Sequence, residues 1–385
     1  MILRDIKPIK SNSFFVFGAR GTGKSTLVQQ YLSEKSVYYD LLDEEVFDRL
    51  MMMGPQIIEA VCAEKKYEWI ILDEIQRLPK TLNLVHRMIE KFGQKFALTG
   101  SSSRKLKRGG ANLLAGRAFV NTLFPLTSRE LGQAFDLDTV LQWGSLPKIL
   151  SLKTDEEKTA YLRSYYLTYI REEIQMEQAV RRLEPFREFL PVAAQCSGKI
   201  LNFSKIGRAV GVQVPTVQTY FQILEDTFIG FYLPHHHRSI RKSQKESPKF
   251  YLFDNGVKKA LEGSLDSKPI RGTSGYGEQF EAFVIQEIFR QNDYQKKDYR
   301  LSYFQTKNGA EIDIVLSRGK NTILIEIKSS NRIDEIEVHK LAKLREAFGS
   351  GVKAYYLSND QHELKINDIH CRHWLRFLNH EFKLL

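Results

Sequence analysis

Short runs of apolar residues alternate with amphipathic stretches through the first part of the chain. Strands that are buried on both faces read as continuous apolar runs, whereas helices place apolar residues every three or four positions. We therefore predict an α/β domain with a mostly parallel sheet over residues 1–150. Its strands are expected at residues 14–17, 36–43, 67–73, 96–100 and 118–123, and its helices at 23–32, 55–64 and 78–91.

Residues 151–265 show a different pattern, in which helical periodicity dominates. A long amphipathic helix is expected over residues 155–170, and we interpret its aromatic stripe as core rather than as a platform for nucleobases. Farther on, a helix, a turn at Gly211 and a second helix that begins at Pro215 have the spacing of a helix-turn-helix. The predicted core of this pair consists of Ile206, Val210, Val217, Phe221 and Leu224, and its outward face carries Gln213, Thr216, Gln218 and Thr219.

Two apolar segments after this pair, at residues 228–234 and 249–253, predict the strands of a wing. The connection over residues 235–245 is basic and is suited to lie along phosphates. Its three adjacent histidines are expected to form a solvated turn, because neighbouring residues on a strand point to opposite faces and cannot share a metal ion. We predict a winged helix-turn-helix domain that binds DNA, or alternatively docks protein or other domains.

Residues 266–385 combine an amphipathic helix with alternating strands. The helix is expected at residues 275–288, the strands at 301–304, 311–316 and 322–327, and a covering helix around 338–348. Side chains two positions apart on a strand share a face. Glu311 therefore lies on the same face as Asp313, and Glu326 on the same face as Lys328. This part of the chain is predicted to form a second α/β domain.

Length, charge and cysteine content narrow the class of protein. The 385 residues, of which 42% are apolar, exceed what one core usually organises, so two or three domains are expected. A formal net charge of +11 favours a polyanionic partner, either nucleic acid or an acidic membrane surface. Cys62, Cys196 and Cys371 lie far apart, which fits free thiols. With neither a signal-peptide core nor an apolar run near the ~20 residues of a membrane span, a soluble, cytoplasmic protein is expected.

A glycine-rich stretch after the first strand fits the pattern G-x-x-x-x-G-K-[ST]. The predicted nucleotide-binding residues are Gly18, Ala19, Arg20, Gly21, Thr22, Gly23, Lys24, Ser25 and Thr26. Backbone N–H groups of such a loop cradle phosphates. Lys24 is expected to reach the terminal phosphates of ATP, and the Ser25 hydroxyl to bind Mg²⁺. The alternative, a flexible glycine-rich turn, is disfavoured by the buried strand that precedes the motif.

The third predicted strand ends in two acids, Asp73 and Glu74, which is the Walker B arrangement. Parallel strands place these carboxylates beside the phosphate-binding loop. Asp73 is expected to hold Mg²⁺ through water, and Glu74 to polarise the attacking water, so the doublet favours hydrolysis over binding alone. An ordinary acidic strand end is the alternative.

Three further features of this part of the chain are candidates for function. Ser101 follows the fourth strand, where a hydroxyl can sense the γ-phosphate. Arg117 is either an arginine finger for a neighbouring subunit, which would require a homo-oligomer, or a salt-bridged structural residue. The basic loop over residues 104–110 is either a nucleic-acid contact or a solvated run of charge.

The ordered motifs of the first 130 residues resemble a known family. The segments GARGTGKST, WIILDEIQRLP, LTGSSSRKL, LLAGR and FPLT occur in this order. They are similar to the prokaryotic AAA-type ATPases that carry a C-terminal domain of unknown function, and the resemblance extends through the remaining chain. It implies a P-loop fold with an additional strand and a catalytic glutamate, which agrees with the roles given to Lys24, Asp73 and Glu74.

The acids of the C-terminal strands suggest a second metal site. Asp313 and Glu326 can share a divalent cation, while Lys328 orients or deprotonates a metal-bound water for attack on a phosphodiester. The D…E-x-K order resembles the restriction-endonuclease-like PD-(D/E)xK nucleases, and Glu281 matches the metal-binding acid that this family often supplies from its first helix. No proline precedes Asp313, which departs from the family pattern. Alternating acids and lysines also occur on solvated strands, and Lys340 is a further candidate near the site.

Together these features predict a cytoplasmic, Mg²⁺-dependent ATPase that drives or gates a DNA-binding, nuclease-like half. The competing hypothesis is an ATP-dependent switch that binds nucleic acid or a protein partner without cutting.

Overall fold

The computed structural model describes residues 2–32, 35–102, 114, 116–170, 183–237, 239, 243–244, 246–349 and 351–385. The basic loop predicted to contact nucleic acid, residues 104–110, lies outside the described residues, as does part of the connection over residues 235–245. Among the described residues, no helix combines the length and the apolar character needed to cross a membrane.

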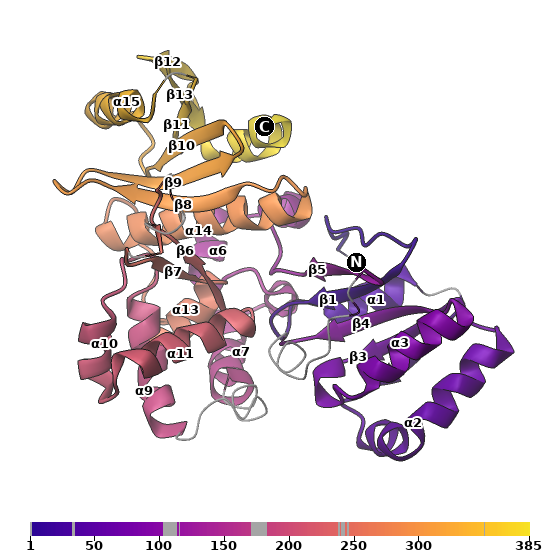
Figure 1. Ribbon diagram of the computed structural model, residues 1–385. Helices are drawn as coiled ribbons and strands as arrows, with labels where there is room; N and C mark the ends of the chain where they lie inside the picture. Colours follow the sequence, from indigo (N-terminus) through magenta and orange to yellow (C-terminus); the bar gives the residue numbers. More distant parts are fainter. Residues whose placement is uncertain are drawn as a thin grey trace.

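The N-terminal region is built on a five-stranded, fully parallel sheet with the order β2-β3-β4-β1-β5 (Figure 1). Its strands are β1 (Ser13–Phe17), β2 (Ser36–Asp40), β3 (Trp69–Asp73), β4 (Lys95–Gly100) and β5 (Ala118–Thr122). Its helices are α1 (Lys24–Tyr31), α2 (Glu44–Glu64), η1 (Ile75–Arg77) and α3 (Thr81–Phe92). The predicted parallel α/β sheet is confirmed.

Alternation along the strands explains how the two faces of this sheet are covered. Phe14 and Val16 point to the face packed by α1, whereas Phe15 and Phe17 point to the face packed by α2 and α3. Both sets are buried, which is why the strands read as continuous apolar runs. The predicted helix at residues 55–64 is only the second half of α2, because Pro55 lies beyond a kink at Met53 rather than at the start of a helix.

The middle region is mostly helical. Its elements up to the helix pair are α5 (Ser128–Leu131), η2 (Gly132–Ala134), α6 (Leu137–Trp143), η3 (Pro147–Ser151), α7 (Asp155–Ser164), η4 (Tyr165–Ile170) and α9 (Leu183–Gln195). They are followed by α10 (Phe203–Val210), α11 (Val214–Asp226), β6 (Gly230–Leu233), β7 (Lys249–Leu252) and α13 (Asn255–Glu262).

The pair α10 and α11 has the predicted turn and the predicted core. Gly211 ends α10 in the left-handed conformation, with φ 69°, and a Cβ on Gly207 would lie 2.6 Å from the Val212 oxygen. The close turn therefore depends on two glycines. All five residues expected in the core are buried. Of the four residues expected on the outward face, Gln213, Gln218 and Thr219 are exposed, and Thr216 is half-buried.

The C-terminal region is a six-stranded mixed sheet with the order β12-β13-β11-β10-β9-β8. Its strands are β8 (Arg300–Gln305), β9 (Glu311–Arg318), β10 (Asn321–Ile327), β11 (Lys353–Ser358), β12 (Leu364–Ile366) and β13 (Ile369–His373). Its helices are α14 (Ser274–Tyr294), α15 (Glu335–Phe348), α16 (Trp374–Arg376), η5 (Phe377–Glu381) and α17 (Phe382–Leu384). Helix α14 packs on one face, together with the C-terminal helices, and α15 packs on the other (Figure 1).

The histidine segment was expected to form a solvated turn, and this expectation is wrong for its first two members. The His236 N–H donates to the Tyr303 oxygen at 2.5 Å, and the His236 ring contacts Ser302 Oγ at 3.2 Å. The His235 ring lies 3.2 Å from the Gln305 oxygen. The segment is half-buried because β8 offers an unpaired edge, which these residues cover.

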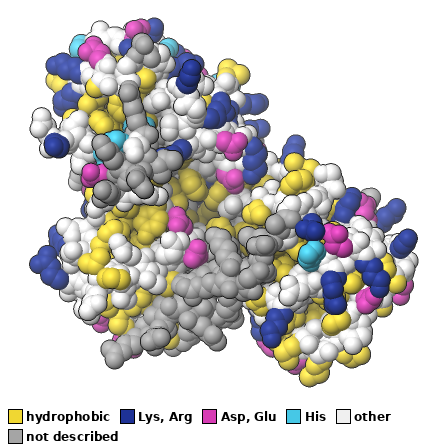
Figure 2. Space-filling view, in the orientation of Figure 1, with side chains coloured by type: hydrophobic (Ala, Val, Ile, Leu, Met, Phe, Trp, Pro, Cys, Tyr) yellow, Lys and Arg dark blue, Asp and Glu magenta, His cyan; other side chains and the backbone are white. Residues whose placement is uncertain are grey.

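The middle and C-terminal regions are joined by buried polar contacts. Glu287 of α14 accepts hydrogen bonds from the backbone and side chain of Ser128, and Arg290 donates to the Phe253 oxygen at 2.6 Å. In the space-filling view, hydrophobic side chains are visible in the recess between the two halves of the molecule, and the described Lys and Arg side chains are scattered over the outer surface (Figure 2).

Candidate functional site

The glycine-rich loop connects β1 to α1. A Cβ on Gly18 would lie only 2.2 Å from the Leu123 oxygen, so the loop can pass β5 only with glycine at this position. Gly23 caps α1 in the left-handed conformation, with φ 93°. The buried Lys24 folds back over the loop, and its Nζ donates to the oxygens of Gly18 at 3.0 Å and Ala19 at 3.3 Å. The N-terminus of α1 and the Lys24 ammonium thus face the same loop.

Asp73 lies at the end of β3, where it is held by two hydroxyl groups. Thr99 Oγ1 donates to one carboxylate oxygen and Tyr38 donates to the other. The Ser25 side chain lies near Tyr38 and works against the rise in its pKa, so Tyr38 neighbours both residues predicted to bind Mg²⁺. Burial and the Asp73 carboxylate raise the pKa of Tyr38, which keeps its hydroxyl protonated as a donor.

Glu74 forms an ion pair with Lys24, with 3.6 Å between its Oε1 and the lysine Nζ. Its other oxygen accepts hydrogen bonds from Ser101 Oγ at 3.1 Å and from Gln76 Nε2. Burial raises the pKa of Glu74, but the Lys24 charge and the bonds from Gln76 and Ser101 outweigh it and leave the pKa below its usual value. Glu74 is therefore ionised and able to accept a proton.

The backbone of Glu74 is unusual for a non-glycine residue. Its φ of 58° and ψ of 48° lie in the left-handed region, and its N–H donates to Thr99 Oγ1 at 3.0 Å. Such a conformation costs about 1 kcal/mol or more and persists only where the surroundings impose it. The turn aims the carboxylate back toward Lys24.

Of the other two candidates, only Ser101 joins this group. Ser101 also accepts a hydrogen bond from Gln76 Nε2 at 2.7 Å. Arg117 instead forms an ion pair with Glu90 of α3, and its side chain is 39% exposed. Within one chain this matches the salt-bridged alternative, and a role toward a neighbouring subunit stays a prediction.

The loop backbone is also held by residues from outside the sheet. Arg4 Nη1 donates to the Thr22 oxygen at 2.7 Å, and the Tyr165 hydroxyl donates to the Arg20 oxygen at 2.8 Å. A Cβ on Gly21 would lie 3.2 Å from the Tyr161 hydroxyl. The α7–η4 segment of the middle region therefore lies directly against the loop.

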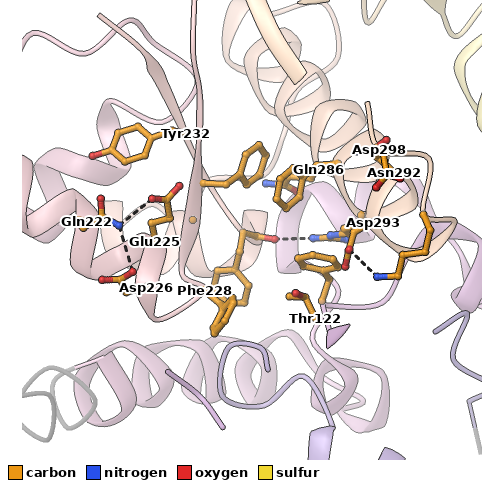
Figure 3. Close-up of a pocket in the computed structure, with 17 residues that line it drawn as sticks. Thr122, Gln222, Glu225, Asp226, Phe228, Tyr232, Gln286, Asn292, Asp293 and Asp298 are labelled. Carbon is orange, nitrogen blue, oxygen red and sulfur yellow. Dashed lines mark hydrogen bonds and ion pairs between the residues drawn. The ribbon is translucent and has the colours of Figure 1, made fainter. Parts of the chain in front are cut away.

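A cavity of about 470 Å³ lies where the three regions meet (Figure 3). Thr122 lines it from the end of β5, Glu225 and Asp226 from the end of α11, and Asp293 from the end of α14. Phe228 lies between these walls in the left-handed conformation, with φ 61°, and its ring stacks on Phe17 with 6.0 Å between ring centroids. Because Phe17 directly precedes the glycine-rich loop, this contact connects the nucleotide site to the middle region.

The acids predicted to form the second site do meet in one pocket. It has a volume of about 410 Å³ and lies among β9, β10, α14 and α15. Its charged lining residues are Lys249, Glu281, Glu311, Asp313, Glu326, Lys328, Glu337 and Lys340. Lys328 forms an ion pair with Glu326, and Asp313 Oδ2 accepts a hydrogen bond from the Ile327 N–H at 2.7 Å. Lys340 pairs with Glu337 at 2.6 Å on the rim.

When they are ionised, the carboxyl groups of this pocket carry more negative charge than the neighbouring lysines offset. Burial, followed by the charge of Asp313, raises the pKa of Glu326 to about 8 and that of Glu281 to about 7. Burial also raises the pKa of Asp313. A divalent cation would relieve this repulsion.

Two carboxyl groups of the pocket, those of Asp313 and Glu326, come from neighbouring antiparallel strands. Within the described parts of the chain, no group of three or more His, Cys, Asp or Glu side chains is arranged to hold a metal ion. Mg²⁺ commonly uses one or two carboxylates and takes its remaining ligands from water and phosphate. Asp313 and Glu326 supply two carboxylates to the pocket. The Glu281 Oε1 atom instead accepts a hydrogen bond from the Tyr251 hydroxyl at 3.1 Å and lies 3.7 Å from Lys249 Nζ.

Sequence reasoning missed several of these contacts. Tyr38, Gln76 and Thr99 touch the acids of the nucleotide site, and Lys249 and Tyr251 touch those of the second pocket. Gln76 and Thr99 lay inside two of the recognised segments, WIILDEIQRLP and LTGSSSRKL, but neither was given a role. The others come from neighbouring strands, which local patterns do not identify.

The parallel sheet, the glycine-rich loop before α1 and the acids at the end of β3 define a P-loop nucleotide-binding fold. Comparison with protein families agrees, because residues 10–132 match the family described as "AAA domain". Residues 134–268 match "Domain of unknown function (DUF8612)", and residues 276–376 match "Domain of unknown function (DUF4143)". These matches confirm the predicted combination of an AAA domain with a C-terminal domain of unknown function.

Relatives and solved structures resemble this chain at low identity. An "Uncharacterized protein" of Mycobacterium tuberculosis is 24% identical over 264 residues, which are 68% of this chain and 59% of the relative. The match thus spans less than two thirds of the relative. An "Uncharacterized protein" of Haemophilus influenzae is 22% identical over 344 residues, which are 80% of this chain and 84% of the relative. The replication initiator DnaA bound to AMPPCP and single-stranded DNA is 16% identical, covering 56% of this chain and 83% of its own, with a TM-score of 0.31.

Proposed function

We propose that this protein is a Mg²⁺-dependent ATP hydrolase. The observation that carries the proposal is the position of the ionised Glu74 carboxylate, 3.6 Å from Lys24 and hydrogen-bonded to Ser101 at 3.1 Å. Lys24 would bind the terminal phosphates, Ser25 and Asp73 would hold Mg²⁺, and Glu74 would polarise the attacking water. The match of residues 10–132 to the AAA domain family supports the same reaction.

A Glu74→Gln variant tests the hydrolytic role. It keeps the size and hydrogen-bonding capacity of the side chain but removes its basicity, so nucleotide affinity should persist while turnover falls about 100-fold or more. Nucleotide binding is measured by fluorescence titration and turnover by phosphate release. A Glu90→Gln variant is the matched control, since Glu90 lies on the surface of α3 and pairs with Arg117. Equal turnover in Glu74→Gln and wild type would reject the role of Glu74.

We further propose that the middle region is a winged helix-turn-helix domain and that ATP hydrolysis drives or gates its action on DNA. The support is the α10–α11 pair with its exposed Gln213, Gln218 and Thr219, together with the net charge of +11. Because His235 and His236 dock on β8, the exposed face of α11 is the better candidate for the contact. Stimulation of ATP turnover by single-stranded, duplex or branched DNA tests this role.

For the C-terminal region we propose a nuclease-like PD-(D/E)xK site with one divalent cation on Asp313 and Glu326. The support is the shared pocket and the position of Lys328 beside Glu326. Lys328 would orient or deprotonate the attacking water. The test is digestion of single-stranded, duplex and branched DNA with Mg²⁺ or Mn²⁺. Wild type should cut, and a Glu326→Ala/Lys328→Ala double variant should not.

A non-cleaving, ATP-dependent switch is the second candidate function. One observation favours it, namely the Lys249 ammonium among the acids that a nuclease site would offer to metal. If wild type and the double variant leave all DNA substrates equally intact, the nuclease proposal is rejected and the switch is preferred.

A further inference from the structure

The acidic pocket of the C-terminal region contains a lysine that does not belong to that region. Lys249 is the first residue of β7, yet its Nζ forms an ion pair with Glu311 and lies 3.7 Å from Glu281 Oε1. The ammonium also lies 5.5 Å from the centroid of the Tyr303 ring, and the side chain is only 6% exposed. A buried ammonium is costly unless it is paired, so these contacts fix it in place.

The backbone that carries Lys249 is held on both sides. Lys249 pairs with Leu233 of β6, and β7 also receives hydrogen bonds from the Gly198 N–H to the Phe250 oxygen at 2.8 Å and from the Leu201 N–H to the Pro248 oxygen at 2.9 Å. The ammonium therefore enters the pocket from a strand whose position the middle region sets.

The carboxylates of the pocket fall into two groups. Glu281 and Glu311 face Lys249, whereas Glu326 is paired with Lys328 and Asp313 neighbours both lysines. When all lining groups are ionised, five carboxylates face three ammonium groups, and the two remaining negative charges equal the charge of one divalent cation. Without the Lys249 ammonium, three negative charges would remain, and Glu281 and Glu311 would lose their ion-pair partner.

We infer that Lys249 is a built-in counter-cation, supplied by the middle region, that occupies Glu281 and Glu311 and thereby limits the acidic pocket to a single divalent cation on Asp313 and Glu326. This inference rests on the proposed cation site. It identifies Lys249 as a positioning residue that sets how many cations the pocket takes. The metal count then depends on the contact between the middle and C-terminal regions.

The number of Mn²⁺ ions bound by the nucleotide-free, full-length chain tests the inference. Electron paramagnetic resonance of free Mn²⁺ gives this number without any nuclease activity. Wild type should bind one ion at the pocket, and Lys249→Met should bind two, because Glu281 and Glu311 become available as oxygen ligands. Lys249→Arg keeps the positive charge and should bind one.

Two controls separate the possible outcomes. Lys91→Met removes an exposed lysine that pairs with Glu59 and should leave the count at one, and thermal unfolding verifies that each variant is folded. One ion in both wild type and Lys249→Met, lost in Asp313→Asn, would overturn the inference but not the cation site. Two ions in wild type would also overturn it. If neither wild type nor Lys249→Met binds Mn²⁺, the proposed cation site and the inference fail together.

Discussion

The nucleotide site and the acidic pocket each place a lysine beside a buried carboxyl group, but the pKa of Glu74 and that of Glu326 are shifted in opposite directions. In the nucleotide site, the Lys24 charge and two hydrogen bonds overcome burial and lower the pKa of Glu74. In the acidic pocket, burial and mutual repulsion dominate, and the pKa of Glu326 rises to about 8. The neighbours of Glu74 thus offset the effect of its burial, whereas the neighbours of Glu326 do not.

The two sites also differ in how the chain assembles them. The acids of the nucleotide site come from one parallel sheet whose strand ends meet at one edge, as they do in α/β folds generally. The acidic pocket takes Glu281 from a helix, Asp313 and Glu326 from two antiparallel strands, and Lys249 from another region. The nucleotide site therefore depends mainly on local motifs, whereas the acidic pocket depends on how the regions of the chain pack together.

The largest effect is expected from Lys24→Ala, which removes the ammonium group that lies beside Glu74 and the glycine-rich loop. Loss of a charge-assisted contact to phosphate should weaken nucleotide binding by about 100-fold or more and abolish turnover. Fluorescence titration with a nucleotide analogue measures the affinity. Lys91→Ala is the control on the surface of α3. Unchanged affinity in Lys24→Ala would mean that the loop does not bind phosphate as proposed.

A divalent cation should stabilise the protein, because it neutralises the excess of carboxylates over lysines in the acidic pocket. At a Mn²⁺ concentration near 100 times the dissociation constant, linkage stabilises the fold by about 2.7 kcal/mol, which raises the melting temperature by a few degrees. Scanning calorimetry with Mn²⁺ and then with excess chelator measures the shift. Asp313→Asn should lose most of it, while Asp138→Asn, an exposed acid paired with Arg271, should retain it. A shift of equal size in Asp313→Asn would locate the cation elsewhere.

Phe228 tests whether the nucleotide site is coupled to the middle region through packing. Phe228→Ala removes the ring that stacks on Phe17 and should destabilise the protein by about 2 kcal/mol. Phe228→Gly loses the same ring but accepts the φ of 61° without strain, so it should be about 1 kcal/mol more stable than Phe228→Ala. Urea denaturation compares the two. The reverse order of stability would show that strain at this position is negligible.

The smallest effect is expected from Tyr165→Phe, which removes only the hydroxyl that donates to the Arg20 oxygen at 2.8 Å. Loss of one hydrogen bond of about 1 kcal/mol should weaken nucleotide binding roughly 5-fold. The number of bound Mn²⁺ ions should stay the same, because Tyr165 contacts the loop and not the acidic pocket. Tyr166→Phe is the neighbouring control. A change in Mn²⁺ binding without a change in nucleotide affinity would contradict the assignment of Tyr165 to the nucleotide site.

The sequence alone determined the features that depend on neighbours along the chain. Burial on both faces makes the parallel strands continuous apolar runs, so β1, β3 and β4 and the motifs at their ends were predictable. Strand alternation also placed Asp313 with Glu311 and Glu326 with Lys328. Helix starts were less predictable, because α2 continues past a kink at Met53 that its sequence pattern does not reveal.

Only the tertiary structure decided which distant side chains reach each acid. Tyr38 meets Asp73 because β2 is the neighbour of β3, and Lys249 enters the acidic pocket because β7 packs against α14 and β9. Neither contact has a signature in spacing or periodicity, since it depends on strand order and on the docking of separate regions. These contacts set the hydrogen-bonding and ion-pair partners of the carboxyl groups and, in the second site, the number of cations that we infer they accept.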